Sequence, residues 1–144
     1  MALESSHRCF RIDNTDHIMV VRLKDRLNIH CPHAPPDSNK PLEYSAVYRV
    51  SAFGYEHCEL DDSAELVMSC DRPREPTTFT VAFRTFTPNP GGLEYRPNTT
   101  YYFISTSDGS KTGLDNKRGG LCESRNVRMK IEVRERNTLS NSLP

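Results

Sequence analysis

The chain has 144 residues, a length that suits one domain with its own hydrophobic core. Lysine plus arginine and aspartate plus glutamate both number 19, so the formal net charge is zero, which argues against a general nucleic-acid or membrane-surface binder, since these need an excess of positive charge. No apolar run approaches the roughly 20 residues that span a bilayer.

The first half of the chain predicts three β-strands. Residues 18–21 form a continuous apolar run, which is typical of a strand buried on both faces. Apolar residues then alternate with polar ones in 27–31 and again in 44–50, which is the pattern of a strand buried on one face. The turn-forming sequence PPDSN separates these two strands. We expect a short helical turn at 53–58.

The second half predicts three more strands. In 79–83 the apolar residues alternate, and 101–104 is a run of three aromatic residues and an isoleucine. In 127–134 apolar residues alternate strictly with charged ones, which makes this segment the clearest half-buried strand of the chain. A second short helical turn is expected at 113–117.

The connection from Phe86 to Tyr95 is the segment that the sequence marks for binding. It holds two prolines and two glycines in an apolar context, whereas loops usually face water and are polar. A stiff loop loses little entropy on docking, and exposed side chains such as Phe86 and Leu93 would serve as anchors for a pocket. The alternative is a buried hairpin loop that merely closes the sheet.

Many short strands without a long amphipathic helix predict an all-β fold, either a sandwich or a Greek-key barrel. We find no internal repeat. The residues after Glu135 are polar and are expected to be a disordered remnant of a stalk.

The five cysteines favour an oxidising compartment. They are Cys9, Cys31, Cys58, Cys70 and Cys122. None forms a CxxC pair, so a zinc knuckle or a thioredoxin-like site is unexpected. The wide spacing of the cysteines suits long-range disulfides, but the spacing does not determine which cysteines pair. The N-terminal sequence MALESSHR lacks the apolar core of a signal peptide, so the protein is either cytosolic or has lost its targeting segment. The cysteines and the sequon Asn98-Thr99-Thr100 favour a secreted or surface-exposed domain.

No metal or cofactor is expected. The sequence His30-Cys31-Pro32-His33 is an incomplete ligand set, and we interpret it as a disulfide cysteine beside surface histidines. A blue-copper site needs a cysteine, a histidine and usually a methionine close together, but His57 is the last histidine of the chain. The acidic stretch between residues 56 and 65 lacks the ligand spacing of a calcium loop and is interpreted as a solvated face.

An enzyme is not expected either. The chain has no GxSxG, HExxH or P-loop motif, and Cys9, the one spare cysteine, has no recognisable oxyanion-hole motif around it. Besides a binding domain, the sequence leaves two alternatives open: a secreted cupredoxin-like copper protein and an extracellular glycan-binding sandwich.

The order and spacing of several segments resemble the extracellular receptor-binding domain of the ephrins. The matching segments cover most of residues 10–134 and are LKDRLNIHCP, EYSAVYRV, the spacing to Cys58 and Cys70, FTVAFRTFTP, LEYRPNTTYYFISTSDGS and GLDNKRGGLC. The resemblance implies a Greek-key β-barrel that is cupredoxin-like but without copper. It also implies the disulfides Cys31–Cys70 and Cys58–Cys122, with Cys9 left over. We expect an N-terminal extension at 1–9, the ephrin domain at 10–135 and the stalk remnant at 136–144.

The resemblance also implies a function. Ephrins are membrane-anchored ligands of Eph receptor tyrosine kinases and signal between touching cells, in cell and axon guidance. The chain would therefore be a cell-surface ligand that is glycosylated at Asn98 and binds an Eph ectodomain. It would cluster with other ephrins and would bind no nucleic acid. It would be attached to the membrane only through an anchor outside this sequence. Its receptor-binding residues would be Phe86, Thr87, Pro88, Asn89, Pro90, Gly91, Gly92, Leu93, Glu94 and Tyr95.

The tip of this segment departs from the family pattern. Many ephrins carry a bulky apolar residue there, whereas this chain has Pro90-Gly91. We therefore expect the anchors to lie on the flanks of the tip, with Glu94 adding a charged contact. These anchors would be Phe86, Pro88, Leu93 and Tyr95.

Overall fold

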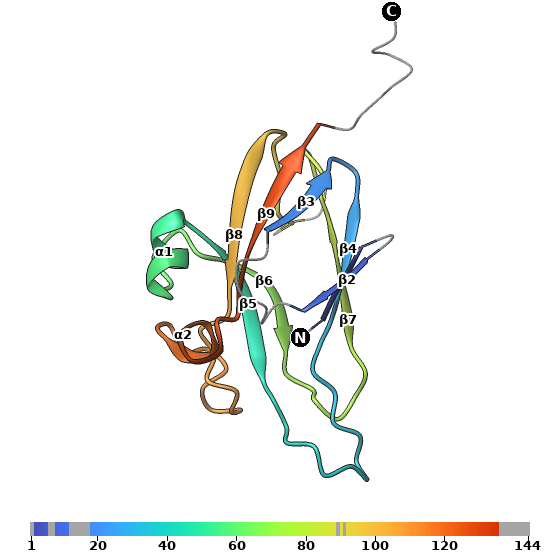
Figure 1. Cartoon of the computed structure of the whole chain (residues 1–144), viewed down its shortest axis with the longest axis vertical. Helices are drawn as coiled ribbons and strands as arrows, with labels where there is room; N and C mark the ends of the chain where they lie inside the picture. Colours follow the sequence, from blue (N-terminus) through green and yellow to red (C-terminus); the bar gives the residue numbers. More distant parts are fainter. Residues whose placement is uncertain (1, 6–7, 12–17, 89, 91, 136–144) are drawn as a thin grey trace, which may run out of the picture.

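The computed structural model describes residues 2–5, 8–11, 18–88, 90 and 92–135. In these residues it has nine strands and two short helices, and the strands form two sheets that face each other across one core (Figure 1). The expected all-β fold is confirmed. The predicted stalk remnant at 136–144 lies outside the described residues.

The first sheet has four antiparallel strands in the order β2-β1-β4-β7. Its strands are β2 (Arg8–Arg11), β1 (Ala2–Ser5), β4 (Arg26–His30) and β7 (Thr78–Ala82). The segment expected as an N-terminal extension therefore contributes β1 and the start of β2 to this sheet. Because β7 is at one edge of the sheet, the segment that follows it is free to leave the layer.

The second sheet has five strands in the order β3-β9-β8-β5-β6. Its strands are β3 (Ile18–Arg22), β9 (Arg128–Arg134), β8 (Thr99–Ile104), β5 (Ser45–Val50) and β6 (Glu65–Cys70). Only β3 and β9 pair in parallel, and all other neighbours are antiparallel. Strands β7 and β8 follow each other in the chain but belong to different sheets.

Apolar side chains from both sheets form the main core. Strand β9 contributes Met129, Ile131 and Val133, all at most 3 % exposed, while the charged residues between them face outward, as the alternation predicts. The prediction that residues 18–21 are buried on both faces is wrong. Ile18 and Val20 are 54 % and 48 % exposed, because β3 is an edge strand whose other face alone contacts the core.

Two short helices cover one end of the five-stranded sheet. Helix α1 (Ala52–His57) agrees with the expected helical turn, and its N-cap residue Ser51 accepts a hydrogen bond from the backbone N–H of Gly54. Helix α2 (Gly120–Arg125) was not predicted. The helical turn expected at 113–117 is absent, since the described backbone there forms turns instead of a helix.

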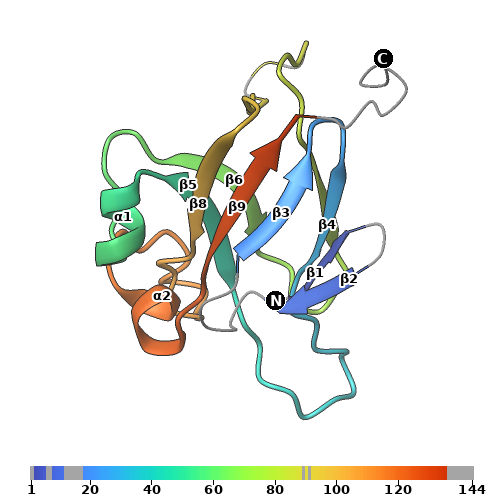
Figure 2. The same ribbon diagram turned by 45° about the horizontal axis from the view of Figure 1, so that its top comes forward.

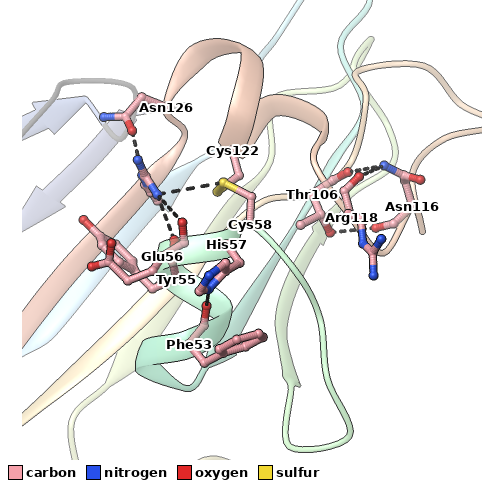
Figure 3. The surroundings of a disulfide bond; sticks show 11 residues. Phe53, Tyr55, Glu56, His57, Cys58, Thr106, Asn116, Arg118, Cys122 and Asn126 are labelled. Carbon is pink, nitrogen blue, oxygen red and sulfur yellow. Dashed lines mark hydrogen bonds between the residues drawn. A yellow bond between two sulfur atoms is a disulfide. The ribbon is translucent and has the colours of Figure 1, made fainter.

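Both expected disulfides are present. Cys31–Cys70 joins the residue after β4 to the end of β6 and so links the two sheets. Cys58–Cys122 joins the C-terminus of α1 to α2, and Figure 3 shows it between these two helices. The bridged cysteines lie 39 and 64 positions apart in the sequence, and each bridge is expected to stabilise the fold by roughly 4 kcal/mol through the entropy of the unfolded chain.

Arg128, the first residue of β9, holds the C-terminal end of helix α1 through a hydrogen bond. Its guanidinium donates to the carbonyl oxygen of Tyr55 at 2.8 Å and to the side-chain oxygen of Asn126 at 2.6 Å, and Figure 3 labels both acceptor residues near the disulfide. The same guanidinium lies 5.2 Å from the centre of the Tyr55 ring. The helical end of the sandwich is therefore held by a disulfide and by a cation at once.

Candidate functional site

The segment between β7 and β8, residues 83–98, is the candidate site and is called the β7–β8 loop below. It begins at an edge strand of one sheet and ends in the middle of the other sheet, so it bridges the two layers. In Figure 2 it projects beyond the ends of the strands, at the top of the view. Of the predicted binding residues, Asn89 and Gly91 lie outside the described residues.

Backbone hydrogen bonds close the base of this loop. The N–H of Tyr95 donates to the carbonyl oxygen of Arg84 at 2.8 Å, so the two arms of the loop meet before they separate toward the tip. Phe83 pairs with the turn between β3 and β4, donating to Asp25 at 3.0 Å and accepting from Lys24 at 2.7 Å. The loop therefore starts from a fixed position on the scaffold.

Tyr95 anchors the base of the loop from inside the protein. Its side chain is 1 % exposed, and its ring meets those of Phe83 and Tyr101 edge to face, with 4.9 Å between the centres in each pair. Such pairs contribute about 0.5–1.5 kcal/mol each beyond area burial. The expectation that Tyr95 contacts a partner is therefore corrected, because a partner cannot reach a buried ring.

Arg49 on β5 ties the loop to the five-stranded sheet. Its guanidinium donates to the carbonyl oxygen of Glu94 at 2.8 Å and pairs with the carboxylate of Glu65 at 2.7 Å. It also lies 4.9 Å from the ring centre of Tyr95 and 5.1 Å from that of Tyr101. Sequence reasoning missed this residue, because an arginine in an alternating strand indicates only a solvent-facing position.

Burial raises the pKa of Tyr95 to about 12, although the positive charge of Arg49 opposes the shift. Among the described residues the Tyr95 hydroxyl has no hydrogen-bond partner. The neutral phenol is therefore the form that the folded protein holds at physiological pH.

The outer part of the loop is accessible. Phe86 is 71 % exposed, the highest value among the large hydrophobic residues that the structure describes, and Pro88 and Pro90 are exposed as well. Leu93 is half-buried and packs against the main core. The carboxylate of Glu94 accepts a hydrogen bond from the backbone N–H of Thr87 at 3.3 Å, which links the two arms above the base.

Two grooves flank the loop. The first, called the β6–β7 groove, lies between the edge strands of the two sheets and has a volume of about 290 Å³. Its lining residues are Leu66, Val67, Thr80, Val81, Ala82, Arg84, Thr87, Gly92, Leu93 and Tyr95. The second, called the Phe86 groove, has a volume of about 410 Å³ and lies against the β3–β4 turn. Its lining residues are Leu23, Lys24, Arg26, Phe83, Arg84, Thr85 and Phe86.

The described cysteines and carboxylates do not assemble a metal centre. Cys31, Cys58, Cys70 and Cys122 are all in disulfides and offer no thiolate. Over the described part of the chain, no group of three or more histidine, cysteine, aspartate or glutamate side chains is placed to hold a metal ion. None of the helices in that part has the length and apolar character needed to cross a membrane.

The fold and site together define a cupredoxin-like β-domain whose accessible feature is a projecting loop with an exposed Phe86. Comparison with known proteins agrees with this class. The ephrin family model matches residues 3–133. Ephrin-B1 of Xenopus laevis is 35 % identical over 116 residues, which cover 81 % of this chain and 35 % of that protein. Ephrin-4 of Caenorhabditis briggsae is 33 % identical over 147 residues, which cover 90 % of this chain and 40 % of that protein.

A solved structure supports the same assignment. The crystal structure of the human ephrin A2–ephrin A1 complex matches with a TM-score of 0.63 and 27 % identity, covering 83 % of this chain and 85 % of that one. The chain belongs to the ephrin family. It spans 35 % to 40 % of the length of the two curated relatives. Ephrins are non-enzymatic ligands of Eph receptors at the cell surface, so the expectation that the chain is not an enzyme agrees with its family.

Proposed function

We propose that this domain is the receptor-binding part of a membrane-anchored cell-surface ligand and that it binds the ectodomain of an Eph receptor tyrosine kinase through the β7–β8 loop. The contact residues would be Phe86, Thr87, Pro88, Asn89, Pro90, Gly91, Gly92, Leu93 and Glu94. Binding would trigger contact-dependent signalling in cell and axon guidance. Tyr95, which the sequence placed in this set, is left out of the proposed contacts because its side chain is buried in the domain.

The observation that carries the proposal is the exposure of Phe86 on a loop whose base is fixed. Phe86 is 71 % exposed, so a partner that covers its side chain makes the free energy of binding more favourable. The contribution is about 25 cal/mol per Å² of buried apolar surface. The backbone pairing of Tyr95 with Arg84 and the hold of Arg49 on Glu94 leave little conformational entropy to lose at the base. The β6–β7 groove beside the loop offers a recess for side chains of the receptor.

Binding of the purified domain to a panel of Eph ectodomains tests this proposal. Phe86→Ala should weaken binding at least about tenfold, equivalent to about 1.4 kcal/mol, with an unchanged free energy of unfolding, because the side chain makes few contacts within the domain. Phe53→Ala is the matched control, because Phe53 is 55 % exposed but lies on helix α1. Equal affinities of the two variants would refute the role of the loop, and no binding to any Eph ectodomain would refute the function.

We also propose that the ligand acts as a cluster of ephrin domains. The related human structure is described as a complex of two ephrins. Sedimentation of the domain over a range of concentrations tests this part separately, since a strictly monomeric domain at high concentration would contradict it while leaving receptor binding intact.

A further inference from the structure

The chain contains a single N-x-Ser/Thr triplet, Asn98-Thr99-Thr100, and the structure places it where a large modification fits. Asn98 occupies the turn directly before β8 and has the left-handed backbone conformation, with a φ of 59°. Asparagine tolerates this conformation better than most residues. Both Asn98 and Thr100 are exposed. A group attached to the Asn98 amide therefore points into solvent without disturbing the core.

Three other asparagines of the described chain form side-chain hydrogen bonds within the domain. The amide nitrogen of Asn116 donates to the carbonyl oxygens of Thr106 at 2.8 Å and Arg118 at 2.6 Å, as Figure 3 shows. The side-chain oxygen of Asn126 accepts from Arg128, and that of Asn28 accepts from the Thr80 hydroxyl at 2.8 Å. None of these three begins a sequon. Asn98 is therefore set apart from these three by its sequon, and its own side chain is exposed.

Two disulfides show that the chain suits an oxidising compartment, which in eukaryotic cells is also where N-linked glycans are added. We propose that Asn98 carries an N-linked glycan. Its amide nitrogen forms a bond to C1 of the first sugar of an oligosaccharide that is carried on a polyprenyl pyrophosphate. The bond from C1 to the pyrophosphate oxygen breaks, the lipid pyrophosphate leaves with the electron pair, and the amide nitrogen loses one proton. No oxidant or reductant is required.

The position of the glycan leaves the β6–β7 groove open. The pairing of Thr99 with Val133 puts Asn98 beside the end of β9, where the backbone of Arg134 also binds Leu23 of the β3–β4 turn. The residues that line the β6–β7 groove come from β6, β7 and the loop arms up to Tyr95, and none comes from β9 or from residues 96–100. The glycan therefore restricts a receptor to approach from the β6–β7 side, an inference that rests on the proposed function.

Secretion of the whole chain from eukaryotic cells behind an added, cleavable signal peptide, followed by intact-mass and glycopeptide mass spectrometry, tests the site. We expect the wild-type mass to exceed the sequence mass by one N-glycan, and enzymatic release of the glycan to convert Asn98 to aspartate. Thr100→Ala should remove the glycan, whereas the matched variant Thr100→Ser should keep it. Both substitutions affect an exposed side chain, so both variants should be secreted and should form both disulfides. An unmodified Asn98 in secreted, disulfide-bonded wild-type protein would overturn the proposal.

The direction of approach has its own readout. We expect wild-type and Thr100→Ala proteins to bind an Eph ectodomain with affinities that agree within about twofold. A gain of tenfold or more on loss of the glycan would show that the glycan covers the contact surface and would overturn the approach from the β6–β7 side. A glycosylated protein that binds no Eph ectodomain in either form would refute the proposed function and leave the modification site standing.

Discussion

The guanidinium of Arg49 donates to the backbone carbonyl of Glu94 at 2.8 Å and so connects strand β5 to the far arm of the β7–β8 loop. These two residues lie 45 positions apart in the chain. The Arg49 side chain is 15 % exposed, and the rings of Tyr95 and Tyr101 lie against it. A single cation therefore fixes the position of the loop relative to the five-stranded sheet.

Arg49→Lys should lower the free energy of unfolding by about 1–3 kcal/mol, because a lysine cannot bind Glu94 and Glu65 together and leaves a carbonyl without its charged donor. Urea denaturation measures this change. Arg134→Lys is the control, since the ion pair of Arg134 with Glu132 is exposed and should be worth less than about 0.5 kcal/mol. Equal effects of the two substitutions would show that Arg49 does not hold the loop.

Tyr95 should make stability fall at alkaline pH. Its pKa is about 12 in the folded protein and 10.0 in the reference state, so between these values the unfolded chain binds fewer protons than the folded one. The free energy of unfolding is then unaffected below about pH 10 and decreases as the pH rises toward about 12, by at most about 3 kcal/mol.

Tyr95→Phe isolates this contribution. Near neutral pH the variant should be about as stable as the wild type or more stable, because the lost hydroxyl is buried without a partner among the described residues. Above about pH 10 its advantage should grow. Unfolding by urea at several pH values, for both proteins, measures the difference. Parallel curves for the two proteins would contradict the raised pKa of Tyr95.

The flanks of the loop tip should each contribute to receptor affinity. Leu93→Ala removes a half-buried side chain that lines the β6–β7 groove and should lower both affinity and stability. Pro88→Ala should lower affinity alone, through about 0.4–1 kcal/mol of extra flexibility in the free loop. Calorimetric titration with an Eph ectodomain separates the two effects. If both variants bind as tightly as the wild type, the flank anchors proposed for this chain are wrong.

Gly120 should be the least replaceable of the described glycines at positive φ. Its φ is 57°, and a Cβ atom there would overlap the carbonyl oxygens of Thr106 and Ser107. Gly120→Ala should therefore destabilise the protein by more than about 3 kcal/mol. Gly109→Ala is the matched control, because its φ is 93° but no atom lies within 4 Å of the new Cβ. Its cost should be near 1–2 kcal/mol, so similar midpoints in urea would contradict the steric argument.

Periodicity in the sequence predicted the strands well where one face is buried. Strand β9 follows its alternation residue by residue, and α1 begins one residue before the predicted turn. The apolar run at 18–21 led to a wrong prediction of burial on both faces. The exposed residues Ile18 and Val20 lie on an edge strand, and the sequence does not distinguish them from buried β-branched residues. Helix α2 was missed because it begins at the second glycine of a pair and has no apolar period.

The candidate loop was predictable as a segment but not in its detail. Its apolar residues and prolines mark it as an unusual loop, and Phe86 is exposed as expected. The burial of Tyr95 and the role of Arg49 depend on contacts between segments far apart in the chain. No local pattern distinguishes an aromatic residue that supports a loop from one that projects from it.

The hydrogen bond between Arg84 and Tyr95 divides the β7–β8 loop into a base and a tip. Different interactions constrain the residues of these two parts. Changes between these two residues alter the surface that a partner meets, whereas the base is set by rings and charges within the domain. The exposed residues of the tip can therefore change during evolution while the fold is kept, provided that the half-buried Leu93 keeps its contact with the core. A designer can likewise graft the exposed tip of another relative into this loop while keeping Leu93.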